Sequence, residues 1–189
     1  MNITDLFQRF DNSSNRESGL ARFGTKLAWV EEAFLLTVYK PTAASIISEV
    51  GQELAFPSSL YDWFGYHNGA TLFRTSLTCP GLRLFGCHSR GASLKREEAS
   101  IAIDIRTVNR KKREIVAFGS YSYDGSLLLI DRKSEAVHCC YGREVEPYRA
   151  SWPTLGQWME CELERLCGLF QGDGTCMTDC QGLVPGSGA

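Results

Sequence analysis

The stretch 114–141 reads EIVAFGSYSYDGSLLLIDRKSEAVHCCY, and it decides the fold class. Its three runs of apolar and β-branched residues, EIVAFGS, SLLLID and AVHCCY, each predict a strand. Asp124-Gly125 separates the first two runs, and RKSE separates the last two. Because connections this short join antiparallel neighbours, the stretch predicts a three-stranded antiparallel meander.

Helical patterns are expected before and after this meander, because apolar residues recur there every three or four positions. The ranges predicted to be helical are 4–10, 25–39, 42–54, 58–67, 93–109 and 150–170. Further short strands are predicted at 71–73, 82–86 and 145–148. We therefore expect a single α+β domain, with an antiparallel meander sheet and helices packed on one side.

Two of these assignments depend on local signals. The alternation of isoleucines at 101, 103 and 105 also fits a strand, but acidic residues early in 93–109 and basic residues at its end favour a helix through its dipole. In the last helical range, Ser151 before Pro153 is the expected N-terminal cap.

The chain of 189 residues is long enough for one domain with its own core. We divide it into N-terminal helices and a loop (1–41), the main domain (42–170) and a Gly-rich tail expected to be flexible (171–189). The formal net charge of −2 gives no general attraction to nucleic acid or to an anionic membrane. The N-terminus has no signal-peptide pattern, and no apolar run is long enough to span a bilayer.

Eight cysteines without a secretion signal indicate a reducing compartment, so we expect a cytoplasmic protein whose thiols are free and mostly buried. A metal site in the tail, formed by Cys176, Cys180, Asp173 and Asp179, is a minor alternative. We expect no metal and no cofactor, because the cysteine spacings match no zinc motif.

His67 precedes Asn68-Gly69, a pair suited to a tight turn, so we assign His67 to a helix C-terminus in preference to an active site. His88 beside Cys87 is interpreted as a loop pair, because adjacent side chains rarely face each other. The basic run 110–113 lacks interleaved aromatic residues and is assigned to a solvated loop.

Four residues are candidates for contact with a protein partner. Tyr121, Tyr123 and Asp124 combine aromatic area with a charge beside a turn, as binding hot spots often do. The competing interpretation is that both rings cover the edge of the sheet. On the strand AVHCCY, alternation places either His138 or Cys139 outside, and we expect it to be His138.

The ordered series of motifs resembles the SUKH superfamily, which includes the yeast Smi/Knr cell-wall regulators and bacterial immunity proteins. The resemblance covers about 43–169 of the chain. The matching segments are Ile46 to Leu54, Pro57, Leu60 to Gly69, Ala117-Phe118-Gly119, Asp124-Gly125, Leu128 to Asp131, Ala136-Val137 and Ala150-Ser151-Trp152. The matching residues expected to be structural are Pro57, Trp63, Asn68, Gly69, Phe118, Gly119, Asp131 and Trp152. The stretch 78–96 is longer and richer in cysteine than the resemblance implies.

The resemblance implies an α+β domain without catalytic residues. It further implies an immunity protein that binds a toxin domain, such as a nuclease or deaminase, and covers its active surface. A regulatory scaffold that binds other proteins is the alternative, and a thiol enzyme using Cys87 or Cys139 is a third hypothesis.

Overall fold

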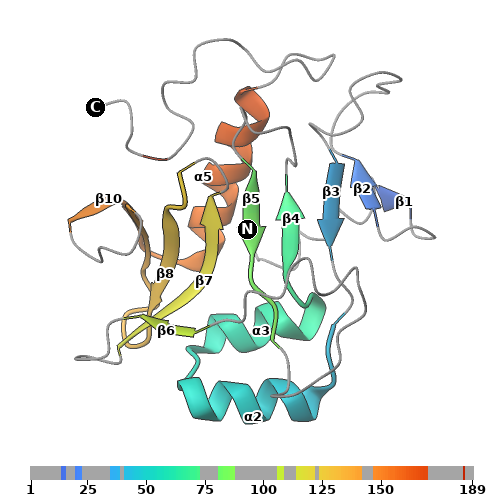
Figure 1. Ribbon diagram of the computed structural model, residues 1–189, viewed down its shortest axis with the longest axis vertical. Coiled ribbons are helices and arrows are strands. Elements are labelled where there is room, and N and C mark those ends of the chain that lie inside the picture. The colour runs from blue at the N-terminus through green and yellow to red at the C-terminus, as the bar shows by residue number, and fades with distance from the viewer. Residues whose placement is uncertain are drawn as a thin grey trace.

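The three apolar runs form three consecutive strands of a sheet in the computed structural model (Figure 1). They give β7 (Ile115–Tyr121), β8 (Leu127–Asp131) and β9 (Val137–Cys140), and each strand pairs antiparallel with the next. The structure describes residues 14–15, 20–22, 35–38, 41–72, 81–87, 106–108, 114–121, 124–141, 147–169 and 185. The predicted meander is therefore confirmed.

Further strands extend this meander on both sides. The additional strands are β1 (Ser14–Asn15), β2 (Leu20–Arg22), β3 (Leu35–Val38), β4 (Ala70–Leu72), β5 (Leu82–Leu84), β6 (Arg106–Val108) and β10 (Tyr148–Trp152). Their order across the sheet is β1-β2-β3-β4-β5-β7-β8-β9-β10, and β6 pairs with the first half of β7. Every pair is antiparallel, and β10 ends the series.

Helix α5 (Leu155–Gly168) lies behind the central strands in Figure 1 and covers one face of the sheet. Its Trp158 is fully buried and meets Phe118 of β7 edge-on, with 5.2 Å between ring centroids. A bulge in β7 between Ala117 and Gly119 inserts Phe118 as an extra residue. The bulge locally bends the strand and re-aims its side chains, and here it accompanies the contact between sheet and helix.

Gly119 permits a close approach of the neighbouring strand. A Cβ atom at this position would lie 2.9 Å from the carbonyl oxygen of Arg83 and 3.0 Å from a methyl carbon of Leu84. Both residues belong to β5, so only glycine fits between β7 and β5 without displacing a strand.

The helices α2 (Ala44–Leu54) and α3 (Ser58–Tyr66) lie together below the sheet in Figure 1. The apolar side of α3 supplies Leu60, Trp63 and Phe64 to the core, and the connection between the two helices supplies Phe56. After α3 the backbone turns at Gly69, whose φ of +88° is costly for residues with a side chain. A Cβ at Gly69 would also lie 2.8 Å from the carbonyl oxygen of Leu84, so glycine is required twice over.

Three predicted elements differ from the structure. Residues 35–38 were expected to be helical but form β3, and residues 106–108 were expected in a helix but form β6. The spacing in 93–109 fitted either structure, whereas the spacing in 25–39 indicated a helix. In both segments pairing with a neighbouring strand selected the extended form. The strand expected at 145–148 lies later, at 148–152.

Ser151 is consequently not a helix cap, because it lies within β10. The hydroxyl of Thr154 takes that role and accepts a hydrogen bond from the backbone N–H of Gln157 at 3.2 Å. His67 lies at the C-terminus of α3 as predicted, directly after its last residue, and its N–H donates to the carbonyl of Trp63 at 3.0 Å.

The described elements form a single α+β domain, as predicted from the sequence. Among the described helices, none is both long and apolar enough to cross a membrane. The predictions for 4–10, for 25–34, for 93–105, for His88, for the basic run 110–113 and for most of the tail lie outside the described residues.

Candidate partner-binding surface

The candidate site lies at β10, the last strand of the described sheet, and on the chain next to it. We call it the β10 edge surface and define it as Asp124, His138, Tyr141, Tyr148 and Arg149. Asp124 and His138 were predicted from the sequence as partner-binding residues, and the structure places both beside β10.

Tyr141 is the most exposed residue of this surface, and Arg149 lies against its ring. Tyr141 is 54% exposed, one of two large hydrophobic side chains among the described residues that are strongly exposed. The guanidinium carbon of Arg149 lies 4.6 Å from the centroid of the Tyr141 ring. A cation over an aromatic face at this distance is attracted by the ring's negative quadrupole, which fixes both side chains relative to each other.

Asp124 forms an ion pair with the guanidinium group of Arg149. The Arg149 Nη1 atom donates to Asp124 Oδ2 at 2.7 Å, and it lies 3.4 Å from Ser126 Oγ. The other carboxylate oxygen of Asp124 accepts the N–H of Ser126 at 2.8 Å, so the turn between β7 and β8 orients the acid. Because both side chains of the pair are largely covered, the ion pair is less screened than a fully exposed one.

His138 lies on β9 and stacks on Tyr148 of β10, with ring centroids 4.0 Å apart and planes inclined by 14°. Its Nδ1 atom is 2.7 Å from Ser151 Oγ. Partial burial lowers the pKa of His138, and the carboxylate of Asp131 opposes this shift without cancelling it. The imidazole is therefore mainly neutral at pH 7. His138 is half-buried and Cys139 fully buried, as the alternation of the strand predicted.

Tyr121 requires a correction, because it is not a surface residue. Its side chain is fully buried beneath α5, where burial and the nearby carboxylate of Glu162 raise its pKa well above the usual value. Its partner candidate Tyr123 lies outside the described residues. The sequence pattern could not separate an inward from an outward ring, because the bulge in β7 shifts the alternation.

Glu162 is the buried acid of this interior cluster, with 1% of its surface exposed. Arg165 binds it with two groups, Nε to Oε2 at 2.9 Å and Nη2 to Oε1 at 2.5 Å. Burial raises the pKa of Glu162, while the hydrogen bonds and charge of Arg165 act in the opposite direction. No sequence pattern predicted that this pair is buried, since acidic and basic residues three positions apart also pair on exposed helix surfaces.

The residues that carry the SUKH resemblance lie at helix ends and turns or are at least partly buried. Pro57 precedes the first residue of α3, and its carbonyl accepts the N–H of Leu60. Asn68 is buried, and its Oδ1 accepts the N–H of Cys87 at 2.7 Å, which joins the α3–β4 turn to the segment after β5. Asn68 does not itself adopt positive φ; Gly69 alone does so in this turn. Trp152 is half-buried on β10.

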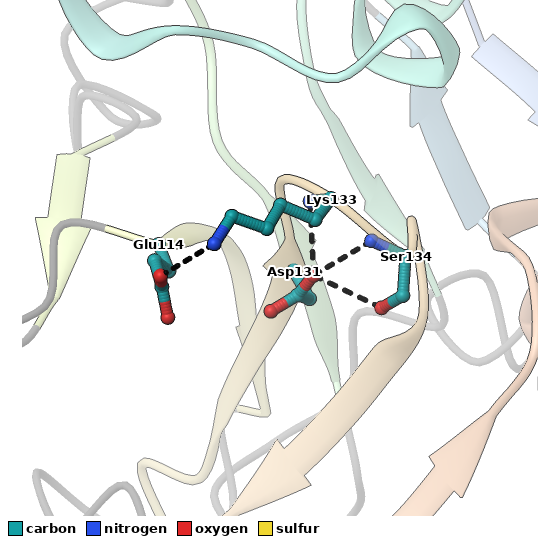
Figure 2. Close-up of polar contacts among 4 residues, drawn as sticks. All are labelled: Glu114, Asp131, Lys133 and Ser134. Atoms are coloured by element: carbon teal, nitrogen blue, oxygen red, sulfur yellow. Dashed lines mark hydrogen bonds and ion pairs between the residues drawn. The ribbon is translucent and has the colours of Figure 1, made fainter.

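Asp131 organises the turn between β8 and β9, as Figure 2 shows. One carboxylate oxygen accepts the N–H of Lys133 at 2.9 Å, the N–H of Ser134 at 2.7 Å and the hydroxyl of Ser134 at 3.0 Å. Partial burial alone would raise its pKa, but these hydrogen bonds outweigh burial and the pKa lies below its usual value. Lys133 Nζ, in the same turn, forms an ion pair at 2.9 Å with Oε1 of Glu114, the residue before β7 (Figure 2).

The cysteines with described surroundings are free thiols. Cys87, Cys139 and Cys140 are buried and Cys161 is exposed, so the expectation of mostly buried thiols holds for this group. Burial raises the pKa of Cys139 to about 12, which keeps it protonated and weakly nucleophilic at neutral pH. Among the described His, Cys, Asp and Glu side chains, no three are arranged to hold a metal ion, and Cys176 and Cys180 lie outside that set.

A scan against protein-family models finds no match to this chain, and a search of curated proteins finds no relative. Sequence reasoning missed Tyr141 and Arg149, which lie on opposite sides of 142–146 and meet only when β9 and β10 pair. A usable signal existed, since Tyr and Arg are the residue types enriched in protein interfaces.

Proposed function

We propose that this chain is a SUKH-like protein-binding domain, and specifically an immunity protein that neutralises a toxin domain by covering its active surface. The observation that carries the proposal is the fixed pair of Tyr141 and Arg149, in which an exposed ring is held under a guanidinium that Asp124 anchors. Tyrosine and arginine dominate binding hot spots, and side chains already held in place lose less entropy on docking.

The mode of action follows from the chemistry of such a surface. Occlusion requires shape and charge complementarity, and it requires no group that makes or breaks bonds. Among the described residues only Nη1 of the Arg149 guanidinium has hydrogen-bond partners, so its other N–H donors make a carboxylate or carbonyl on the toxin domain the complementary group. We expect the partner to place such an acceptor against Arg149 and an apolar or aromatic side chain against Tyr141.

The test is a co-expression experiment with the protein encoded by the neighbouring reading frame. That protein, produced alone, should arrest growth, and co-production of this chain should restore growth. Tyr141→Ala and Arg149→Ala should each lose protection. Tyr66→Ala is the matched control, because Tyr66 is also strongly exposed, at 45%, but lies on α3.

Two results would contradict the proposal. If the neighbouring protein is harmless while this chain binds several other proteins, the scaffold function replaces the immunity function. If protection survives both edge variants and is lost in Tyr66→Ala, the binding surface lies on the helices instead of the β10 edge.

A further inference from the structure

Three adjacent strands bring a carboxylate, an imidazole and a hydroxyl to neighbouring positions. Asp131 ends β8, His138 lies on β9 and Ser151 lies on β10. His138 and Ser151 are direct cross-strand partners, so the backbone ladder sets their separation. Asp131 is near enough to act electrostatically on the imidazole.

The distance between Ser151 and His138 matches that between an activated nucleophile and its base. A serine and its general base lie within about 2.6–3.2 Å of each other, and a third group orients the base. Here Ser151 Oγ lies 2.7 Å from His138 Nδ1. The Tyr148 ring, stacked at 4.0 Å, holds the imidazole plane. Such constellations are identified by geometry and roles, whatever the order along the chain.

Access and protonation state are also suitable. Ser151 is exposed on the last strand of the described sheet, so an external molecule can reach its hydroxyl. Partial burial keeps His138 neutral at pH 7 and able to accept a proton. The titratable and charged groups that act on His138 are Asp131 of β8, with Tyr148 and Ser151 as its contacts on β10.

We propose that Ser151 is a nucleophile activated by His138 and that it accepts the acyl group of an activated ester. In this step Ser151 Oγ bonds to the carbonyl carbon and its proton moves to His138 Nδ1. The bond from that carbon to the leaving oxygen breaks, and the leaving group departs with the electron pair. The product is an O-acyl serine at the β10 edge. This proposal does not depend on any partner protein.

The test uses p-nitrophenyl acetate as the acyl donor with the full chain. Release of p-nitrophenolate is followed by absorbance, and the acetylated residue is mapped by mass spectrometry. Ser151 should be acetylated at least about 100-fold faster than Ser58, an exposed serine whose hydroxyl donates to a carboxylate. His138→Gln should remove this difference in acetylation rate, and Ser151→Ala should abolish acetylation of the peptide that contains position 151.

The pH profile tests the electrostatic effect of Asp131 on His138. The rate should rise with pH as His138 loses its proton, with a midpoint below the usual histidine value of 6.5. Asp131→Asn keeps an oxygen to accept the hydrogen bonds of the turn but removes the charge, so the midpoint should move lower. Equal labelling of Ser151 and Ser58, or a rate indifferent to His138→Gln, would overturn the nucleophile. An unchanged midpoint in Asp131→Asn would overturn the role of Asp131.

Discussion

Glu135, in the turn between β8 and β9, caps helix α3 through Ser58, which precedes it by 77 residues. One oxygen of the carboxylate accepts both the N–H of Ser58 at 3.1 Å and its hydroxyl at 2.7 Å. The other oxygen accepts the N–H of Ser59 at 3.2 Å. A negative charge at the start of a helix also interacts favourably with the helix dipole. This contact therefore ties the helical pair to the sheet.

Glu135→Ala should lower the free energy of unfolding by about 1–2 kcal/mol, because two helical N–H groups and a hydroxyl lose their acceptor. Glu135→Gln keeps one oxygen acceptor and should cost less. Urea unfolding of both variants measures the difference. Equal stability of Glu135→Ala and the unmodified chain would show that the contact contributes nothing.

The same contact predicts a pH dependence. Partial burial acts to raise the pKa of Glu135, but hydrogen bonds from Ser59 and Ser58 outweigh it, and the folded pKa lies below 4.5. A depressed folded pKa stabilises the protein above the unfolded value, and this stability is lost as pH falls through the folded pKa. The difference in free energy of unfolding between the unmodified chain and Glu135→Gln should therefore become smaller below about pH 4.5. A gap that widens on acidification would contradict the assignment.

Two glycines should respond oppositely to alanine. Gly69→Ala combines positive φ with a clash against the Leu84 carbonyl and should cost at least about 2 kcal/mol. Gly65 lies in α3 with open space around it, so Gly65→Ala should stabilise the protein by up to about 1 kcal/mol. Thermal unfolding of the pair compares the same substitution four residues apart. A destabilised Gly65→Ala and a neutral Gly69→Ala would refute this account of the turn.

Glu162→Ala should destabilise the protein by about 2–3 kcal/mol, because the partly buried guanidinium of Arg165 loses its acceptor. Burial raises the folded pKa of Glu162 above 4.5, so ionisation of this acid favours the unfolded chain. Glu162→Gln should accordingly gain stability relative to the unmodified chain as pH rises from the unfolded pKa through the folded one. Urea unfolding at several pH values checks both expectations. If Glu162→Gln loses stability relative to the unmodified chain over that pH interval, the pKa of Glu162 is not raised.

Thiol labelling should follow burial. Cys161 is exposed on α5, whereas Cys139 is buried with its pKa raised to about 12. Iodoacetamide at neutral pH should therefore modify Cys161 well before Cys139, Cys140 or Cys87, as peptide mass spectrometry would record. Fast modification of Cys139 or Cys87 in the folded protein would support the hypothesis of a thiol enzyme.

The sequence predicted the meander and the helices at 42–54 and 58–67, because each has one clear period and clear turn residues. It failed at 35–38, where the spacing indicated a helix, and at 106–108, where the spacing fitted both helix and strand. In both segments pairing with a neighbouring strand decides the structure. The site was predicted in part. Asp124 and His138 were found through local patterns, but Arg149 becomes part of the surface only through contacts with Tyr141 and Asp124.

The dissociation constant of the complex with the growth-arresting partner, measured by calorimetry, tests the protein-binding role most directly. Tyr141→Ala and Arg149→Ala should each weaken binding by about 30-fold or more, the effect of losing about 2 kcal/mol at a hot spot. Tyr66→Ala should leave the constant unchanged. Binding that is insensitive to both edge variants, or that fails only in Tyr66→Ala, would contradict the account.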